Sequence, residues 1–141
     1  MSVQMILAPL FVQVALTLAL MFWMGAWRVV AVRRGEVRIG AIALREPNWP
    51  PRVSQVANAY HNQLELPVLF YVLTILAYIT RHADLLFVLM AWVFVTLRVL
   101  QAFVHVTDNN VPRRGALFVA GAIVLTIMWV IFMVRILLGI G

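Results

Sequence analysis

Long stretches with almost no charged residues restrict this sequence more than any other feature. There are four of them, two without any charge and two with a single charge, at residues 2–27, 53–80, 85–107 and 115–134. An α-helix needs about 20 apolar residues to cross the hydrocarbon of a bilayer. The stretches therefore predict four transmembrane helices, which we place at about residues 4–30, 53–80, 85–107 and 115–137.

Composition agrees with this interpretation. Of the 141 residues, 65% are hydrophobic and only 11% are charged, and the mean hydropathy is +0.99. Soluble domains carry roughly a quarter charged residues, so lipid must cover most of this surface. The length predicts a single domain over residues 1–141. Because cysteine is absent, disulfides and a cysteine nucleophile are excluded, and any reactive thiol would have to come from a ligand.

The connections between the spans differ in length. A long polar loop at residues 28–52 follows the first span, whereas the links at 81–84 and 108–114 are short. Short links favour antiparallel neighbours, which predicts an all-α, up-down-up-down four-helix bundle in the membrane. Pro47, Pro50 and Pro51 prevent the long loop from becoming one continuous helix.

The cationic side chains indicate the orientation in the membrane. All eleven are arginines, and most lie in the first and third loops: Arg28, Arg33, Arg34, Arg38, Arg45, Arg52, Arg113 and Arg114, against Arg81 and Arg135 elsewhere, with Arg98 inside a span. Since cytoplasmic loops are enriched in arginine, we expect the 28–52 and 108–114 loops in the cytoplasm and both termini outside. The basic face would then meet anionic lipid headgroups rather than nucleic acid.

Two spans carry polar side chains at helical spacing. They are spaced so that each set occupies one face of its helix: Asn58, His61, Asn62 and Glu65 in the second span, and Arg98, Gln101 and His105 in the third, continued by Asp108. Glu65 lies roughly 18 Å along its helix from the cytoplasmic start, and Arg98 roughly 14 Å from the cytoplasmic end of the next. Because a lone charge in the bilayer is costly, we predict an ion pair between them.

These polar faces allow two interpretations. They can hold the helices together, or they can line a hydrated cavity that opens to the cytoplasmic side and binds a polar ligand. One ion pair needs no further partners, so the number of polar groups favours the cavity. His61 and His105 have no third ligand at metal spacing, so we expect no metal site. Ser2 and Ser54 are the only serines, which excludes a serine nucleophile within the polar faces.

The order of these motifs resembles the MAPEG family, the membrane-associated proteins in eicosanoid and glutathione metabolism. The resemblance covers nearly the whole chain and includes Asn62-x-x-Glu65-x-Pro67, Arg98, the Arg113-Arg114 pair and the basic segment at residues 32–37. At Gln101, His105 and Phe118 the sequence differs from the better-known synthases and is more similar to the uncharacterised bacterial branch of the family.

The resemblance implies a homotrimer, expected in a bacterial inner membrane, that binds glutathione or a similar thiol between subunits. Residue by residue, it places the glutathione-binding side chains at Arg33 or Arg34, His61, Asn62, Glu65, Arg98, Gln101 and His105. Arg114, or else Arg113, would stabilise the thiolate, which a permanently charged guanidinium can do.

The leading hypothesis is therefore a glutathione-dependent transferase or peroxidase-like enzyme that acts on a lipophilic electrophile from the bilayer. One alternative is a non-catalytic trimeric membrane scaffold or ligand-binding protein. A third hypothesis, movement of protons or solutes through the cavity, lacks the internal repeat and paired broken helices of transporters.

Overall fold

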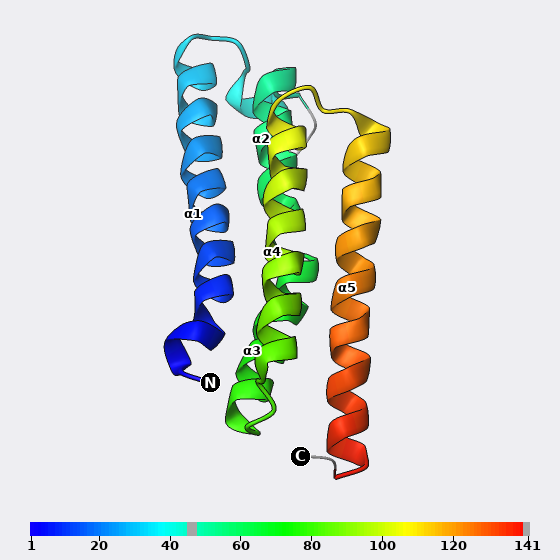
Figure 1. Ribbon diagram of the computed structural model, residues 1–141. Helices are drawn as coiled ribbons and strands as arrows, with labels where there is room; N and C mark the ends of the chain where they lie inside the picture. The colour runs from blue at the N-terminus through cyan, green and yellow to red at the C-terminus, as the bar shows by residue number, and fades with distance from the viewer. Residues whose placement is uncertain (45–47, 140–141) are drawn as a thin grey trace.

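The computed structural model describes residues 1–44 and 48–139, so Arg45 and Pro47 of the first loop lie outside the described residues. Within these ranges the regular elements are all helical: α1 (Val3–Arg33), the short 3-10 helix η1 (Ile39–Ala41), α2 (Pro51–Asn62), α3 (Leu66–Ile79), α4 (Leu85–Val106) and α5 (Val111–Leu137), as Figure 1 shows. Four segments are long and apolar enough to cross a membrane, with α2 and α3 together forming the second. The all-α prediction with four spans is confirmed.

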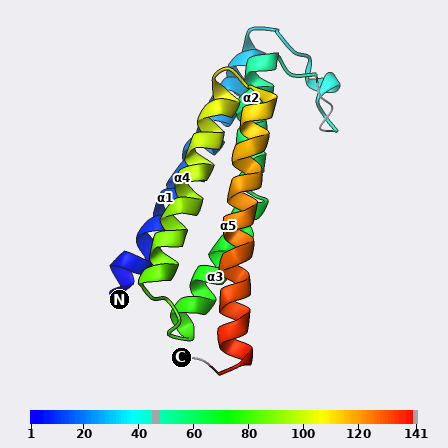
Figure 2. The same cartoon turned by 45° about the vertical axis from the view of Figure 1, so that its right-hand side comes forward.

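The spans alternate in direction, so the two termini lie at one end of the bundle (Figure 1). The long first loop and the short link between α4 and α5 lie together at the opposite end. Figure 2 shows the first loop, with η1, reaching out to one side beyond the start of α2. The predicted up-down-up-down bundle is thus correct, and the two arginine-rich loops share one face.

Short polar side chains mark where several helices begin. The Ser2 hydroxyl accepts a hydrogen bond from the Met5 amide at 3.2 Å, and Asp84 accepts one from the Phe87 amide at 3.0 Å. Asn110 does the same for the Arg113 amide at 3.0 Å. Such caps satisfy amides that have no partner inside the helix. Because Asn110 starts α5 at Val111, the Arg113-Arg114 pair lies in the first turn of α5 and not in the loop where we expected it.

The second span is present as predicted, but it is divided into α2 and α3, so the prediction of one continuous helix was wrong. Pro67 has no amide hydrogen to donate to the Gln63 carbonyl, and in a continuous helix its ring would clash with that carbonyl. The chain instead tightens into two short turns, in which the Gln63 and Leu64 amides bond three residues back at 2.9 and 3.0 Å. Glu65 follows these turns with non-helical backbone angles (φ −98°, ψ −102°). It therefore lies beyond the end of α2.

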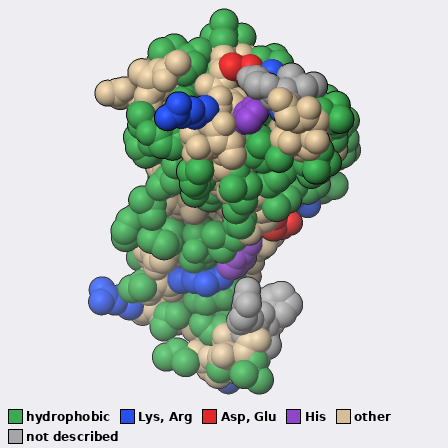
Figure 3. Space-filling model, turned by 90° about the horizontal axis from the view of Figure 1, so that it is seen from below, with side chains coloured by type: hydrophobic (Ala, Val, Ile, Leu, Met, Phe, Trp, Pro, Cys, Tyr) green, Lys and Arg blue, Asp and Glu red, His purple; other side chains and the backbone are tan. Residues whose placement is uncertain are grey.

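An apolar core holds the lower half of the bundle together. Its centre is the stacked pair Phe70 and Phe94, with ring centroids 4.9 Å apart. Large apolar side chains are also exposed on every spanning helix, and Phe22 and Phe103 are each more than 60% exposed. Figure 3 shows the molecule from the end with the termini, and hydrophobic side chains cover most of the surface in this view as well. Such a surface requires lipid around it, so the chain is an integral membrane protein.

Candidate functional site

The polar faces of the second and third spans meet in a pocket of about 430 Å³ near the arginine-rich end of the bundle. We call it the polar pocket. Side chains from α2, the 63–65 break, α4 and α5 line it: Asn58, His61, Asn62, Glu65, Gln101, His105, Arg114, Gly115 and Phe118. Its volume lies within the usual range for small-molecule sites, about 300–1,000 Å³.

The 63–65 break contributes both of the side chains that the predicted motif emphasised. Asn62 is the last residue of α2 and Glu65 immediately precedes α3. Although they do not share one helical face as we predicted, the two tight turns still bring Glu65 to the same pocket as Asn62. Non-helical backbone at membrane depth is tolerated where it lines a polar cavity, and this break does so.

Arg98 is fully buried beside the pocket and does not line it. Its guanidinium donates 2.8 Å hydrogen bonds to the Gln101 side-chain oxygen and to the Asn62 backbone carbonyl. The predicted Glu65–Arg98 ion pair is wrong: no such pair forms in the described part of the chain, where Glu65 acts on Arg98 only through a longer-range electrostatic attraction. The physical reason is the break, which leaves the Asn62 carbonyl with only a long 3.4 Å bond from the Glu65 amide.

A pair of buried amides attaches α1 to the break. Gln13 Nε2 donates to Gln63 Oε1 at 2.9 Å, and Gln63 Nε2 donates to the Ala59 carbonyl at 2.9 Å. Both side chains are almost completely buried. The sequence interpretation missed them because it followed charges and neither glutamine is charged. A glutamine deep in a hydrophobic span is costly without a partner, and this cost could have identified the pair.

The α4 wall of the pocket consists of Gln101 and His105, which lie one turn apart and are both buried. Gln101 is held by Arg98, whereas His105 Nδ1 has no hydrogen-bond partner among the described residues. The Phe118 ring closes the pocket from α5 and lies 6.0 Å from the Arg98 guanidinium carbon. Together these groups present an amide, an imidazole and an aromatic face to one cavity.

The two arginines at the start of α5 differ in position. Arg114 lines the polar pocket, and its guanidinium donates a 2.6 Å hydrogen bond to Asn109 Oδ1. Arg113 forms a 3.2 Å ion pair with Asp108 on the outside, where its side chain is 62% exposed. The pocket cation is therefore Arg114, and the sequence alone could not separate the two candidates.

The candidates from the end of α1 lie elsewhere. Arg33 and Arg34 are exposed and neither lines the polar pocket. Arg34 lines a second pocket of about 350 Å³ together with Trp27, Val30 and Arg52. We call this the basic pocket. Within one chain, therefore, the structure brings the α2, α4 and α5 candidates together but not those of α1.

His61 lines the polar pocket from α2, with its ring 5.4 Å from that of Tyr60. The two predicted pocket histidines do not form part of a metal-binding cluster: among residues 1–44 and 48–139, no three side chains of the metal-ligand types lie together. The chemistry available in the pocket is thus hydrogen bonding by amides and imidazoles, with one carboxylate and one guanidinium.

Comparison with known proteins agrees with this arrangement. The model of the MAPEG family matches residues 6–134, a segment that contains every residue lining the polar pocket. No curated protein and no solved structure matched the chain in the corresponding searches. Because the family match extends through all four spans, the chain belongs to the MAPEG family.

Proposed function

We propose that this protein is a glutathione-dependent transferase or peroxidase-like enzyme that acts on a lipophilic electrophile in the bilayer. The family is one of glutathione and eicosanoid metabolism, which supports the thiol. The observation that carries the proposal is that Arg114 shares one pocket with Asn62 and Glu65. A fixed cation thus lies in the same cavity as groups able to bind a peptide.

The residues of the polar pocket fit glutathione chemically. Asn62 Oδ1 and His105 Nδ1 are buried without a partner in the described part of the chain, and buried polar atoms normally have one. The Glu65 carboxylate would accept hydrogen bonds from the ligand's amino group, while Asn58 and Asn62 would bond its amides and carboxylates. Gln101 and His105 would bind from the α4 side.

In this proposal Arg114 supplies the electrostatic catalysis. Its guanidinium would stabilise the thiolate that forms when the glutathione thiol releases its proton to water in the open pocket. The thiolate sulfur then attacks the electrophilic carbon while the electron pair of the breaking bond moves to the leaving group. No bond to the enzyme forms. The rate gain would come from holding the thiolate and the electrophile together and from a preorganised positive charge.

The lipophilic substrate would reach the pocket from the membrane along α5. Phe118 lines both the polar pocket and an apolar groove of about 270 Å³ that runs down the helix over Val119, Ala122, Ile123, Thr126 and Ile127. An apolar molecule in this groove would therefore have its reactive end next to Arg114. This adjacency supports a substrate that is dissolved in lipid.

We also propose that the protein is a homotrimer whose arginine-rich end faces the cytoplasm of a bacterial cell. The family resemblance includes a glutathione-binding arginine at the end of the first span, yet in one chain neither candidate lines the polar pocket. A neighbouring subunit could supply it. Since Arg34 belongs to the basic pocket, Arg33 is the better candidate for this contact.

Calorimetry of glutathione binding to the detergent-purified protein tests the proposal. The wild type should bind in the micromolar to millimolar range, about −8 to −4 kcal/mol. An Asn62→Ala/Glu65→Gln variant should lose binding, and Arg114→Ala should lose turnover of a model electrophile. Arg113→Ala is the matched control, because Arg113 has the same charge and helix turn but lies outside the pocket.

Two results would overturn the proposal. Absence of glutathione binding by a folded, trimeric sample would assign the polar pocket to another ligand or to structure. Binding with no turnover, unaffected by Arg114→Ala, would favour the alternative of a non-catalytic ligand-binding protein. Proton or solute movement would instead appear as flux in liposomes that contain the protein.

A further inference from the structure

A second site is present at the arginine-rich end of the bundle, outside the polar pocket. The basic pocket lies between the last turns of α1 and the first turn of α2, and its lining combines two guanidiniums, an indole and a small aliphatic side chain. We infer that this pocket binds the phosphate headgroup of an anionic phospholipid, with Arg34 and Arg52 as the phosphate-binding groups.

The charges in this pocket call for an anion. Arg52 is already paired with Glu36 at 2.6 Å, while the Arg34 guanidinium forms no hydrogen bond or ion pair with the described residues. Among the described residues, Glu36 thus neutralises Arg52 alone, and the charge of Arg34 is left over in the pocket. Arginine forks bind phosphate oxygens in pairs, so a phosphate that reaches both side chains would satisfy them together.

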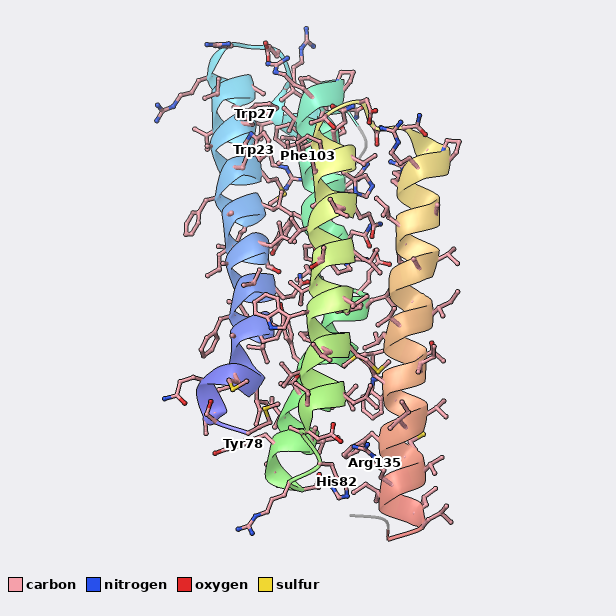
Figure 4. The ribbon with its side chains drawn as sticks, in the orientation of Figure 1. Trp23, Trp27, Tyr78, His82, Phe103 and Arg135 are labelled. Atoms are coloured by element: carbon pink, nitrogen blue, oxygen red, sulfur yellow. The ribbon has the colours of Figure 1, made fainter. Side chains whose placement is uncertain are left out.

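The apolar side of the pocket distinguishes a lipid from a free anion. Trp27 and Val30 form this side, and Val30 is 39% exposed on the outer surface of α1. Trp27 is fixed edge-on against Trp23, with ring centroids 5.3 Å apart, and Figure 4 shows both indoles near the loop end of α1. Tryptophan prefers the level of the headgroups. A lipid would thus place its phosphate on the arginines and its first acyl carbons along Val30 and Trp23.

The neighbouring cation of the same loop is already engaged elsewhere. The Arg28 guanidinium lies 5.0 Å from the centre of the Trp49 ring, and this contact joins the end of α1 to the segment before α2. The walls of the basic pocket are thus held by aromatic contacts on both sides. A pocket whose walls are already placed binds a headgroup more selectively than a basic loop that attracts anionic lipid only through its summed charge.

The test is titration of the detergent-purified full chain with phosphatidylglycerol or phosphatidylcholine, with bound lipid counted by native mass spectrometry. Each arginine at a membrane surface contributes about a fivefold gain in affinity for anionic lipid. We expect phosphatidylglycerol to bind more than tenfold more tightly than phosphatidylcholine, and Arg34→Gln to weaken it about fivefold. Arg38→Gln is the matched control, since Arg38 is an exposed arginine of the same loop outside the pocket.

Several outcomes would overturn the inference. Equal weakening by Arg34→Gln and Arg38→Gln would mean that the loop attracts lipid only through its total charge. Displacement of phosphatidylglycerol by an equal concentration of inorganic phosphate would identify a free anion as the ligand, and displacement by glutathione would assign Arg34 to the thiol site. A thermal melt of each variant in detergent controls for folding. Arg52→Gln supplies a second test of the pocket, and we expect it to weaken phosphatidylglycerol binding about as much as Arg34→Gln does.

Discussion

The Arg114 guanidinium is held by Asn109, which accepts its hydrogen bond at 2.6 Å through Oδ1. Asn109 has a left-handed backbone (φ 52°), and its own amide donates to the Val104 carbonyl at 2.8 Å, which closes the end of α4. Asparagine is one of the few residues that adopt this conformation readily. One loop residue thus ends α4 and directs the pocket cation of α5.

This relationship predicts a role for Asn109 in positioning Arg114. Asn109→Gly keeps the left-handed backbone but removes the oxygen that holds the Arg114 guanidinium, which then becomes mobile. We expect glutathione-dependent turnover to fall roughly tenfold, because one charge-assisted hydrogen bond contributes about that factor. Asn109→Asp keeps both features but adds a negative charge beside Arg114, so it should retain more activity than Asn109→Gly and less than the wild type. Steady-state kinetics on the two variants tests this. Equal loss in both variants, or none in Asn109→Gly, would contradict the prediction.

Arg98 and Glu65 should differ sharply in their effect on stability. Arg98 is buried and donates to two acceptors, so Arg98→Met would leave the Gln101 oxygen without a donor and the Asn62 carbonyl with only the long 3.4 Å bond from the Glu65 amide. We expect a loss of roughly 2–5 kcal/mol in the free energy of unfolding. Glu65 is exposed to the pocket and has no direct ion pair with Arg98, so Glu65→Gln should cost less than about 1 kcal/mol.

Thermal and denaturant unfolding in detergent measures both effects. Glu65→Gln should nevertheless lose glutathione affinity, because the carboxylate lines the polar pocket. If Glu65→Gln unfolded as readily as Arg98→Met, the carboxylate would contribute to stability as a partner of Arg98, which would contradict this prediction.

Much of this molecule follows from hydropathy and charge. The four spans and their alternating direction come from apolar runs and short links, which depend only on local sequence. Helix phase and breaks are harder to predict. The 63–65 break was overlooked because the polar spacing continues through it, although Pro67 is the residue that interrupts the helix. Only the start of α5 decides which of Arg113 and Arg114 faces the pocket. Asp108, Asn109 and Asn110 are all residue types that cap helices, so the sequence did not single out Asn110 as the cap.

Gln13 and Gln63 give a measurable coupling between α1 and the break. Gln13→Leu leaves Gln63 Oε1 without its donor, and Gln63→Leu also frees the Ala59 carbonyl. Hydrogen bonds between membrane helices contribute about 0.6 kcal/mol on average and up to about 1.7. The two single variants should each destabilise the protein, and the double variant should cost less than their sum by about that amount. Additive costs would mean that the 2.9 Å contact contributes no stability.

At the end with the termini, an ion pair closes the bundle. Asp84 contacts Arg135 at 2.9 Å across the gap between α4 and α5, and Figure 4 shows Arg135 at this end of the bundle. Burial raises the pKa of Asp84, but the Phe87 amide and the Arg135 guanidinium outweigh it, so the pKa lies below its ordinary value of 3.8.

When the pKa of a carboxyl is lower in the folded than in the unfolded state, the carboxyl stabilises the fold at pH values above its pKa in the unfolded state. This stability is lost as the pH falls through the pKa of the folded state. Thermal stability in detergent should therefore fall below about pH 4 in part through Asp84. The effect should be at most about 1 kcal/mol, because the side chain is 47% exposed. Asp84→Asn keeps the helix cap and removes the charge, so this variant should be less stable at pH 7 and lose less stability on acidification. If Asp84→Asn lost as much stability on acidification as the wild type, Asp84 would make no contribution to the acid sensitivity. Its pair with Arg135 would then contribute no stability.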